Sequence, residues 1–152
     1  MKVWRLCRQP FVATALDGIG GLYVSGRWHR RGRPIVYAAS SAALAALEVL
    51  VHVDPLDAPE DLRLLTLSLP DDLLIEQVEV AALPARWAAV PAPDELAALG
   101  TEWLASRRGV ALSVPSAVIP MERNLLLNPL HPDVARVRIV GDEAFTFDPR
   151  LM

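Results

Sequence analysis

Cysteine, aromatic residues and net charge are all scarce in this sequence. Cys7 is the one cysteine among 152 residues, so no disulfide can form within the chain. Cysteine clusters and closely spaced histidine pairs are absent, and we therefore predict no metal site. The formal net charge of −3 provides no general positive field, so we expect no direct DNA binding by this chain alone.

Long apolar runs are also absent, although 53% of the residues are hydrophobic and 22% are charged. No segment approaches the roughly 20 apolar residues that a membrane span needs. Lys2, Arg5 and Arg8 interrupt the first residues, which argues against a secretory signal peptide. We therefore expect a cytoplasmic protein whose 152 residues form one globular domain, covering 1–152.

Short strand patterns alternate along the chain with two principal helical patterns. The predicted strands cover 3–6, 22–28, 35–37, 62–69, 74–80 and 110–114, and the predicted helices cover 42–52 and 95–107. A loop is predicted over 122–132, and a closing β-hairpin over 136–147. This order predicts an α+β domain with a split, largely antiparallel sheet and flanking helices.

Glu48 is a carboxylate in an otherwise apolar helix pattern. Ser40 or Ser41 supplies an N-cap oxygen for this predicted helix. The positions that repeat at helical spacing and form its apolar stripe are Leu44, Leu47 and Val51. Glu48 falls on or beside that stripe, where its carboxylate needs a partner or a cavity. On pattern alone, a Glu at the edge of the stripe with its carboxylate in water is the commoner arrangement.

Arg27 and Ser116 each support a structural and a functional interpretation. The Arg27 guanidinium, next to Trp28, could hold a pyrophosphate through two parallel hydrogen bonds or extend over the indole surface. Ser116 has no adjacent histidine and no glycines of a nucleophile elbow, which excludes the usual serine hydrolase pattern. Its residue type alone favours a turn residue that bonds its own backbone.

Several motifs then follow one another in a recognisable order. Gly26-Arg27-Trp28 leads through a basic turn to Val36-Tyr37 and to the helix that contains Glu48. The later motifs lie at 114–120, at Glu122 and Asn124, at 127–132 and at 145–151. In this order they resemble the RES domain family, whose members are toxins of bacterial toxin–antitoxin pairs. Ser25 and His29 depart from the family's usual Gly and Asn.

The resemblance implies a fold similar to that of ADP-ribosyltransferases and a toxin that consumes NAD as its substrate, with no retained cofactor. It assigns catalytic roles to Arg27, Tyr37, Glu48 and Ser116, and it adds Asn124 to the substrate-binding residues. The implied reaction cleaves the nicotinamide–ribose bond, by hydrolysis or phosphorolysis, and so depletes cellular NAD. The implied partner is an Xre-type antitoxin whose C-terminal segment blocks the active site.

The chemistry of that bond suits a single carboxylate. Nicotinamide leaves from a cationic pyridinium and needs no protonation, so Glu48 would stabilise the oxocarbenium ion at the ribose. Arg27 would hold the pyrophosphate, and Tyr37 would pack against the nicotinamide or the ribose. Ser116 would either bind substrate or support Glu48, and both possibilities remain open at this point.

Two other functions compete with NAD cleavage. One is ADP-ribosylation of a specific protein, because the acceptor of the ADP-ribose can be water, phosphate or a protein side chain. The other is a non-catalytic RNA- or nucleotide-binding module that uses the basic cluster Arg30, Arg31 and Arg33. Such a cluster is most often a solvated loop.

Overall fold

One seven-stranded sheet runs through the whole chain, and the computed structural model describes all 152 residues. The strands are β1 Lys2–Arg8, β2 Val36–Ala39, β3 Leu62–Ser68, β4 Ile75–Gln77, β5 Ala111–Pro115, β6 Arg123–Leu127 and β7 Arg138–Phe145. The helices are α1 Gly20–Tyr23, α2 Ala42–Leu50 and α3 Asp94–Ser106. Short 3-10 turns cover Gln9–Phe11, Pro55–Asp57, Val80–Ala82, Pro132–Arg136 and Pro149–Leu151.

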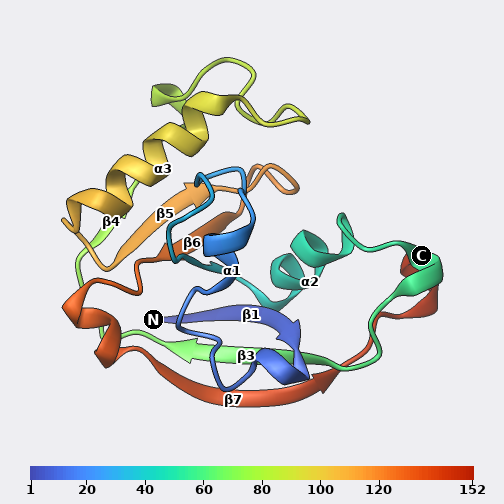
Figure 1. Cartoon of the computed structure of the whole chain (residues 1–152). Helices are drawn as coiled ribbons and strands as arrows, with labels where there is room; N and C mark the ends of the chain where they lie inside the picture. The colour runs from blue at the N-terminus through green and yellow to red at the C-terminus, as the bar shows by residue number, and fades with distance from the viewer.

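The sheet divides into two halves between β1 and β2. Its order is β4-β5-β6-β2-β1-β3-β7, and every neighbouring pair is antiparallel except β4 with β5. Strands β1 and β2 align at one position only, Trp4 with Ala39. Helix α3 lies along the β4-β5-β6 half, and α2 lies beside β1 and β2 (Figure 1). The predicted α+β fold with a split, mostly antiparallel sheet is therefore confirmed.

Three consecutive leucines explain why β6 lies in the middle of the sheet. Leu125 and Leu127 pack into a core shared with β1, β2 and β3, whereas Leu126 packs into the core beneath α3. Successive residues of a strand face opposite sides, so apolar residues at all three positions need cover on both faces. The predicted loop over 122–132 is wrong for 123–127, because a surface connection would leave these side chains in water.

Helix α2 begins and runs as its sequence pattern predicts. Ser41 is the N-cap, and its hydroxyl accepts a hydrogen bond from Leu44 N at 3.1 Å. Leu44 is fully buried, and Glu48 is half-buried on the same helix. The helix ends at Leu50, and Val51, predicted to face the core, has 57% of its surface exposed.

Two other predicted elements are wrong. The segment 22–28 is not a strand, because glycines bend it back onto 33–35: Gly18 has φ +66°, and a Cβ on Gly21 would lie 2.3 Å from Arg33 O. The segment 136–147 is not a hairpin, because Gly141 pairs with Thr66 inside the continuous strand β7. In both places a glycine allows close packing where the sequence pattern predicts a strand or a turn.

Candidate active site

A cavity of about 1130 Å³ opens where the two halves of the sheet diverge. Its walls come from β1, β2 and α2, from the loop 24–28, from residues 90–92 and 117–118, and from Asn124 on β6. Four of the residues singled out in the sequence line it together: Arg27, Tyr37, Glu48 and Asn124. The fifth, Ser116, lies behind the wall and is fully buried.

The Glu48 carboxylate is held through one of its two oxygens. Oε1 accepts hydrogen bonds from the Ser116 hydroxyl at 2.7 Å and from Asn124 Nδ2 at 2.5 Å. Neither side chains nor backbone groups donate to Oε2. Because Glu48 lines the cavity, this arrangement fixes the orientation of the carboxylate and leaves Oε2 available to a bound molecule.

The Ser116 hydroxyl uses its whole hydrogen-bonding capacity within the protein. It accepts from Val118 N and Ile119 N, each at 3.0 Å, and donates its hydrogen to Glu48. A hydroxyl has one hydrogen and two lone pairs, so Ser116 has none left for a substrate. Of the two possibilities left open by the sequence, the geometry favours support of Glu48.

A second contact fixes the helix that carries Glu48. The Ser41 hydroxyl at the N-terminus of α2 donates to Glu122 Oε2 at 2.8 Å. Glu122 closes the loop that begins at Ser116, because Ser116 N donates to Glu122 O at 3.0 Å. The loop 116–122 therefore holds both the start of α2 and the Glu48 carboxylate, two residues before the helix ends at Leu50. Glu122 appears in the sequence motif, but only the structure reveals this contact.

Arg27 is held by backbone carbonyls and not by an acid. Its Nη1 group donates to Trp87 O at 2.8 Å and to Ala89 O at 3.0 Å, and neither Asp nor Glu forms an ion pair with it. Burial lowers the pKa of Arg27, and the nearby Glu48 carboxylate opposes that shift. Two donor groups, Nε and Nη2, have no protein partner, so the guanidinium can hold an anion in the cavity.

Arg5 is a site residue that the sequence analysis missed. It lines the same cavity, and its Nη1 group donates to Tyr37 O at 2.9 Å across the split in the sheet. Its Nε is buried without a hydrogen-bond partner, and burial lowers the pKa of the guanidinium. A charged residue within the apolar pattern of strand β1 was the available signal, because such a residue needs a partner or a ligand.

Tyr37 lies in a buried hydrogen-bond network that reaches Arg5 through its carbonyl and His29 through its hydroxyl. Its hydroxyl accepts from Trp28 N at 3.3 Å and lies 2.8 Å from His29 Nδ1. The other ring nitrogen of His29 lies 2.8 Å from Val24 O. Burial raises the pKa of Tyr37, so its hydroxyl keeps its proton at neutral pH.

The basic cluster Arg30, Arg31 and Arg33 does not line the cavity. Arg30 forms an exposed ion pair with Asp94 at 2.7 Å, and its backbone N donates to Thr101 Oγ1 at 2.9 Å. These contacts seat the loop on α3. The RNA- or nucleotide-binding module that this cluster would form therefore has no structural link to the cavity.

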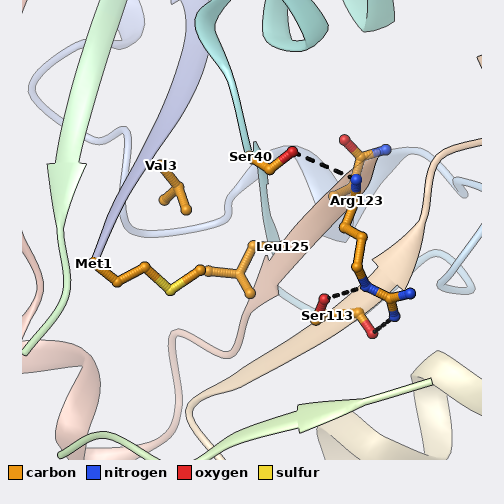
Figure 2. A pocket seen from close by; sticks show the side chains of 7 residues that line it. Met1, Val3, Ser40, Ser113, Arg123 and Leu125 are labelled. Carbon is orange, nitrogen blue, oxygen red and sulfur yellow. Dashed lines mark hydrogen bonds between the residues drawn. The ribbon is translucent and has the colours of Figure 1, made fainter. Parts of the chain in front are cut away.

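A second, much smaller cavity of about 20 Å³ lies beside Met1 and Arg123. Figure 2 shows the Arg123 side chain reaching toward Ser113 on β5, where Nε donates to Ser113 Oγ at 2.7 Å. Its Nη2 group donates to Val78 O at 2.6 Å. A void of this size holds about one water. Arg123 therefore ties β6, which carries Asn124, to its neighbouring strand.

Two further properties bear on the class of site. No three His, Cys, Asp or Glu side chains gather in a way that could hold a metal ion. None of the helices has the length and apolar character needed to cross a membrane. The polar side chains at the wall of the cavity include one carboxylate, two guanidinium groups, a phenol, an amide, the Ser25 hydroxyl and the His52 imidazole.

A family model described as the RES domain matches residues 2–148. The chain belongs to the RES domain family. It is 43% identical over 153 residues to Toxin Res of Pseudomonas putida, with 99% of each chain covered. It is 38% identical over 154 residues to the Prs ADP-ribosylating toxin of Sphingobium sp., with 98% of this chain and 95% of that protein covered.

The RES domain also resembles a chain of the M. tuberculosis MbcT-MbcA toxin–antitoxin complex, with a TM-score of 0.68. The two are 20% identical, and the match covers 99% of this chain and 85% of the other. At that identity the likeness establishes a shared fold. The split, mostly antiparallel sheet of this RES domain is consistent with the ADP-ribosyltransferase-like fold that the sequence resemblance implies.

Proposed function

We propose that this RES domain is the toxin of a toxin–antitoxin pair and that it cleaves the nicotinamide–ribose bond of NAD. The observation that carries the proposal is the Glu48 carboxylate, anchored at Oε1 by Ser116 and Asn124 and open to the cavity at Oε2. A preorganised carboxylate stabilises positive charge without having to reorganise as that charge develops. Family membership supports the same function.

The charges of the cavity complement those of NAD. Arg5 and Arg27 have no acidic partner and can neutralise the two negative charges of a pyrophosphate. Glu48 provides one negative charge beside the nicotinamide ribose, toward which the positive charge of the nicotinamide ring moves as the bond breaks. The volume of about 1130 Å³ is slightly above the roughly 300–1,000 Å³ of typical small-molecule sites, which suits an extended dinucleotide.

In the proposed reaction, the bond between ribose C1′ and the nicotinamide nitrogen breaks and its electron pair returns to the ring. Nicotinamide leaves neutral, and the positive charge moves to C1′ and the ribose ring oxygen. Glu48 Oε2 faces that charge and orients the ribose. An acceptor then attacks C1′ and loses its proton, which yields ADP-ribose when the acceptor is water. Arg27 and Arg5 keep the reacting centre in place by holding the pyrophosphate.

The printed name of one relative favours a second candidate. The Sphingobium protein is called an ADP-ribosylating toxin, and it matches nearly the full length of this chain. Transfer of ADP-ribose to a protein begins with the same bond cleavage and differs only in the acceptor. The same Glu48 geometry therefore supports both reactions.

An antitoxin is the partner that we propose for this toxin. Exposed valines surround the mouth of the cavity: Val24, Val51 and Val90, with 66%, 57% and 89% of their surfaces exposed. A segment of an Xre-type antitoxin that entered the cavity would cover these side chains and exclude NAD. The likeness to a chain of a toxin–antitoxin complex supports such a partner, and both proteins would act in the cytoplasm, where NAD is available.

The experiment measures free nicotinamide released from NAD by the purified, antitoxin-free chain and by Glu48→Gln. We expect turnover to fall on the order of 10²–10³-fold in the variant, because the amide removes the charge that faces the cation. Glu143→Gln is the matched control, because Glu143 is exposed on β7 and does not line the cavity. Its turnover should equal that of the wild type.

Product analysis separates the acceptors. Mass spectrometry with and without phosphate distinguishes ADP-ribose from its phosphorylated form, and therefore hydrolysis from phosphorolysis. If the folded wild-type chain releases nicotinamide only when a protein acceptor is added, the second candidate replaces the first. Equal nicotinamide release by the wild type and Glu48→Gln would overturn the role of the carboxylate.

A further inference from the structure

The hydrogen-bond pattern around His29 determines which of its ring nitrogens carries the hydrogen. His29 has 4% of its surface exposed, and Nε2 lies 2.8 Å from Val24 O. A carbonyl oxygen only accepts, so Nε2 must carry a hydrogen. Burial lowers the pKa of His29 and favours its neutral form, in which Nδ1 has a lone pair and no hydrogen.

The state of His29 in turn fixes the direction of the hydrogen bond to Tyr37. Nδ1 lies 2.8 Å from the Tyr37 hydroxyl, and an unprotonated nitrogen must accept, so the Tyr37 hydrogen points at His29. The Tyr37 oxygen also accepts from Trp28 N at 3.3 Å. One lone pair remains, and Tyr37 lines the cavity. The hydroxyl can therefore accept a hydrogen bond from a bound molecule but cannot donate one.

Gly26 lies directly beside the hydrogen bond between His29 and Tyr37. A Cβ at position 26 would lie 2.8 Å from the Tyr37 hydroxyl and 2.9 Å from His29 Nδ1. The backbone of the loop 24–29 therefore packs directly against the hydrogen bond between the two side chains. Gly26 N also donates to His29 O at 3.0 Å, which closes the loop around it.

We propose that His29 is a specificity-determining residue, which makes Tyr37 an acceptor and so selects a substrate with a carboxamide over one with a carboxylate. The carboxamide of nicotinamide carries N–H donors that match the free lone pair of Tyr37. The carboxylate of nicotinic acid carries only acceptors. Its oxygen lone pairs would face the lone pair of the Tyr37 oxygen and repel it. Ribose hydroxyls do not discriminate, because they both donate and accept. This inference rests on the proposed cleavage of NAD.

The test compares NAD with nicotinic acid adenine dinucleotide in the wild type and in three variants. The measured quantity is kcat/KM for NAD divided by kcat/KM for nicotinic acid adenine dinucleotide. A difference in the intrinsic reactivity of the two dinucleotides affects every variant equally, so it cancels when the ratio of a variant is compared with that of the wild type. His29→Leu removes the acceptor and frees the Tyr37 hydrogen, and Tyr37→Phe removes the hydroxyl. His29→Asn restores an acceptor oxygen near the position of Nδ1. His131→Asn is the control, because His131 lies outside the cavity.

We expect the ratio to fall at least about tenfold in His29→Leu and in Tyr37→Phe, which corresponds to one lost discriminating hydrogen bond. The ratio should stay near the wild-type value in His29→Asn and in the control. A His29→Leu protein that folds, cleaves NAD and keeps the wild-type ratio would overturn the proposal while leaving NAD cleavage in place. Absence of any cleavage by the wild type would instead overturn the proposed function.

A spectroscopic measurement tests the first step without any substrate. Long-range proton–nitrogen correlation spectra of the labelled protein distinguish a protonated ring nitrogen from an unprotonated one. For His29 at neutral pH we expect a hydrogen on Nε2 and none on Nδ1. A hydrogen on Nδ1 would reverse the bond to Tyr37 and contradict the proposal even if the variants change the ratio.

Discussion

The cavity has two walls that are built in different ways. The first, which we call the anchored wall, consists of Glu48 and Asn124, with Ser116 directly behind them. Its residues come from α2, from β6 and from the residue after β5, and side-chain hydrogen bonds join them to one another. The second, the loop wall, consists of residues 24–28 together with Val90 and Ala92. There Arg27 is held by backbone carbonyls of a distant segment.

The difference matches a division of labour between chemistry and binding. Stabilising a cation at C1′ requires a carboxylate in a fixed position, and regular elements provide that position. Holding a pyrophosphate requires charge and hydrogen-bond donors over a larger area, which a loop can supply. Changes to the anchored wall should therefore affect turnover, and changes to the loop wall should affect the binding of NAD.

The largest expected effect comes from Gly100, which supports the loop wall from α3. A Cβ there would lie 1.7 Å from Trp28 O, next to Arg27. Helix propensity alone would make Gly100→Ala stabilising by about 1 kcal/mol. We expect the opposite, a loss of about 3 kcal/mol in the free energy of unfolding, because the loop must be displaced.

Urea unfolding and NAD titration measure both consequences for Gly100→Ala. The matched control is Gly20→Ala, because a Cβ on Gly20 meets no atom within 4 Å. The control should unfold and bind NAD as the wild type does. If Gly100→Ala also kept the wild-type midpoint and affinity, the seating of the loop wall on α3 would be wrong.

Ser116→Ala should have an intermediate effect on the anchored wall. The change removes the donor to Glu48 and leaves the N–H groups of Val118 and Ile119 without their acceptor. We expect a loss of about 1–3 kcal/mol in stability and about a tenfold or greater fall in turnover, with the affinity for NAD nearly unchanged. Stopped-flow cleavage and equilibrium binding separate the two effects.

Ser40→Ala provides the comparison for Ser116→Ala. The Ser40 hydroxyl is exposed and accepts one long hydrogen bond, of 3.4 Å, from Arg123 N. We expect little change in turnover or stability. A fall in affinity without a fall in turnover for Ser116→Ala would assign Ser116 to substrate binding and contradict its position behind the wall.

The anchored wall could be predicted from the sequence better than the loop wall. The Ser41 cap and the position of Glu48 follow from the local pattern of one helix. The contact between Arg27 and residues 87–89 joins segments about 60 residues apart, and no local pattern encodes it. The prediction of a strand over 22–28 failed because Gly21 packs against a distant backbone. Arg5 was missed because only the split sheet places it in the cavity.

His29 should give the free energy of unfolding a small dependence on pH. Burial lowers the pKa of His29 below its usual 6.5, so the unfolded chain binds the proton first as the pH falls. The unfolded state then holds more protons than the native state, and the free energy of unfolding decreases below about pH 6.5. His29→Asn should lose less stability on acidification than the wild type, as measured by urea unfolding. An equal loss would assign the pH dependence to other groups.

The most direct measurement determines the dissociation constant for NAD and the single-turnover rate of cleavage in Glu48→Gln and Arg27→Ala. We predict that Glu48→Gln keeps the wild-type affinity within about threefold and loses cleavage on the order of 10²-fold or more. Arg27→Ala should weaken binding by about 10–100-fold, equivalent to one or two charge-assisted hydrogen bonds. If both variants changed the same parameter, or if Arg27→Ala bound NAD as the wild type does, the division between the two walls would be contradicted.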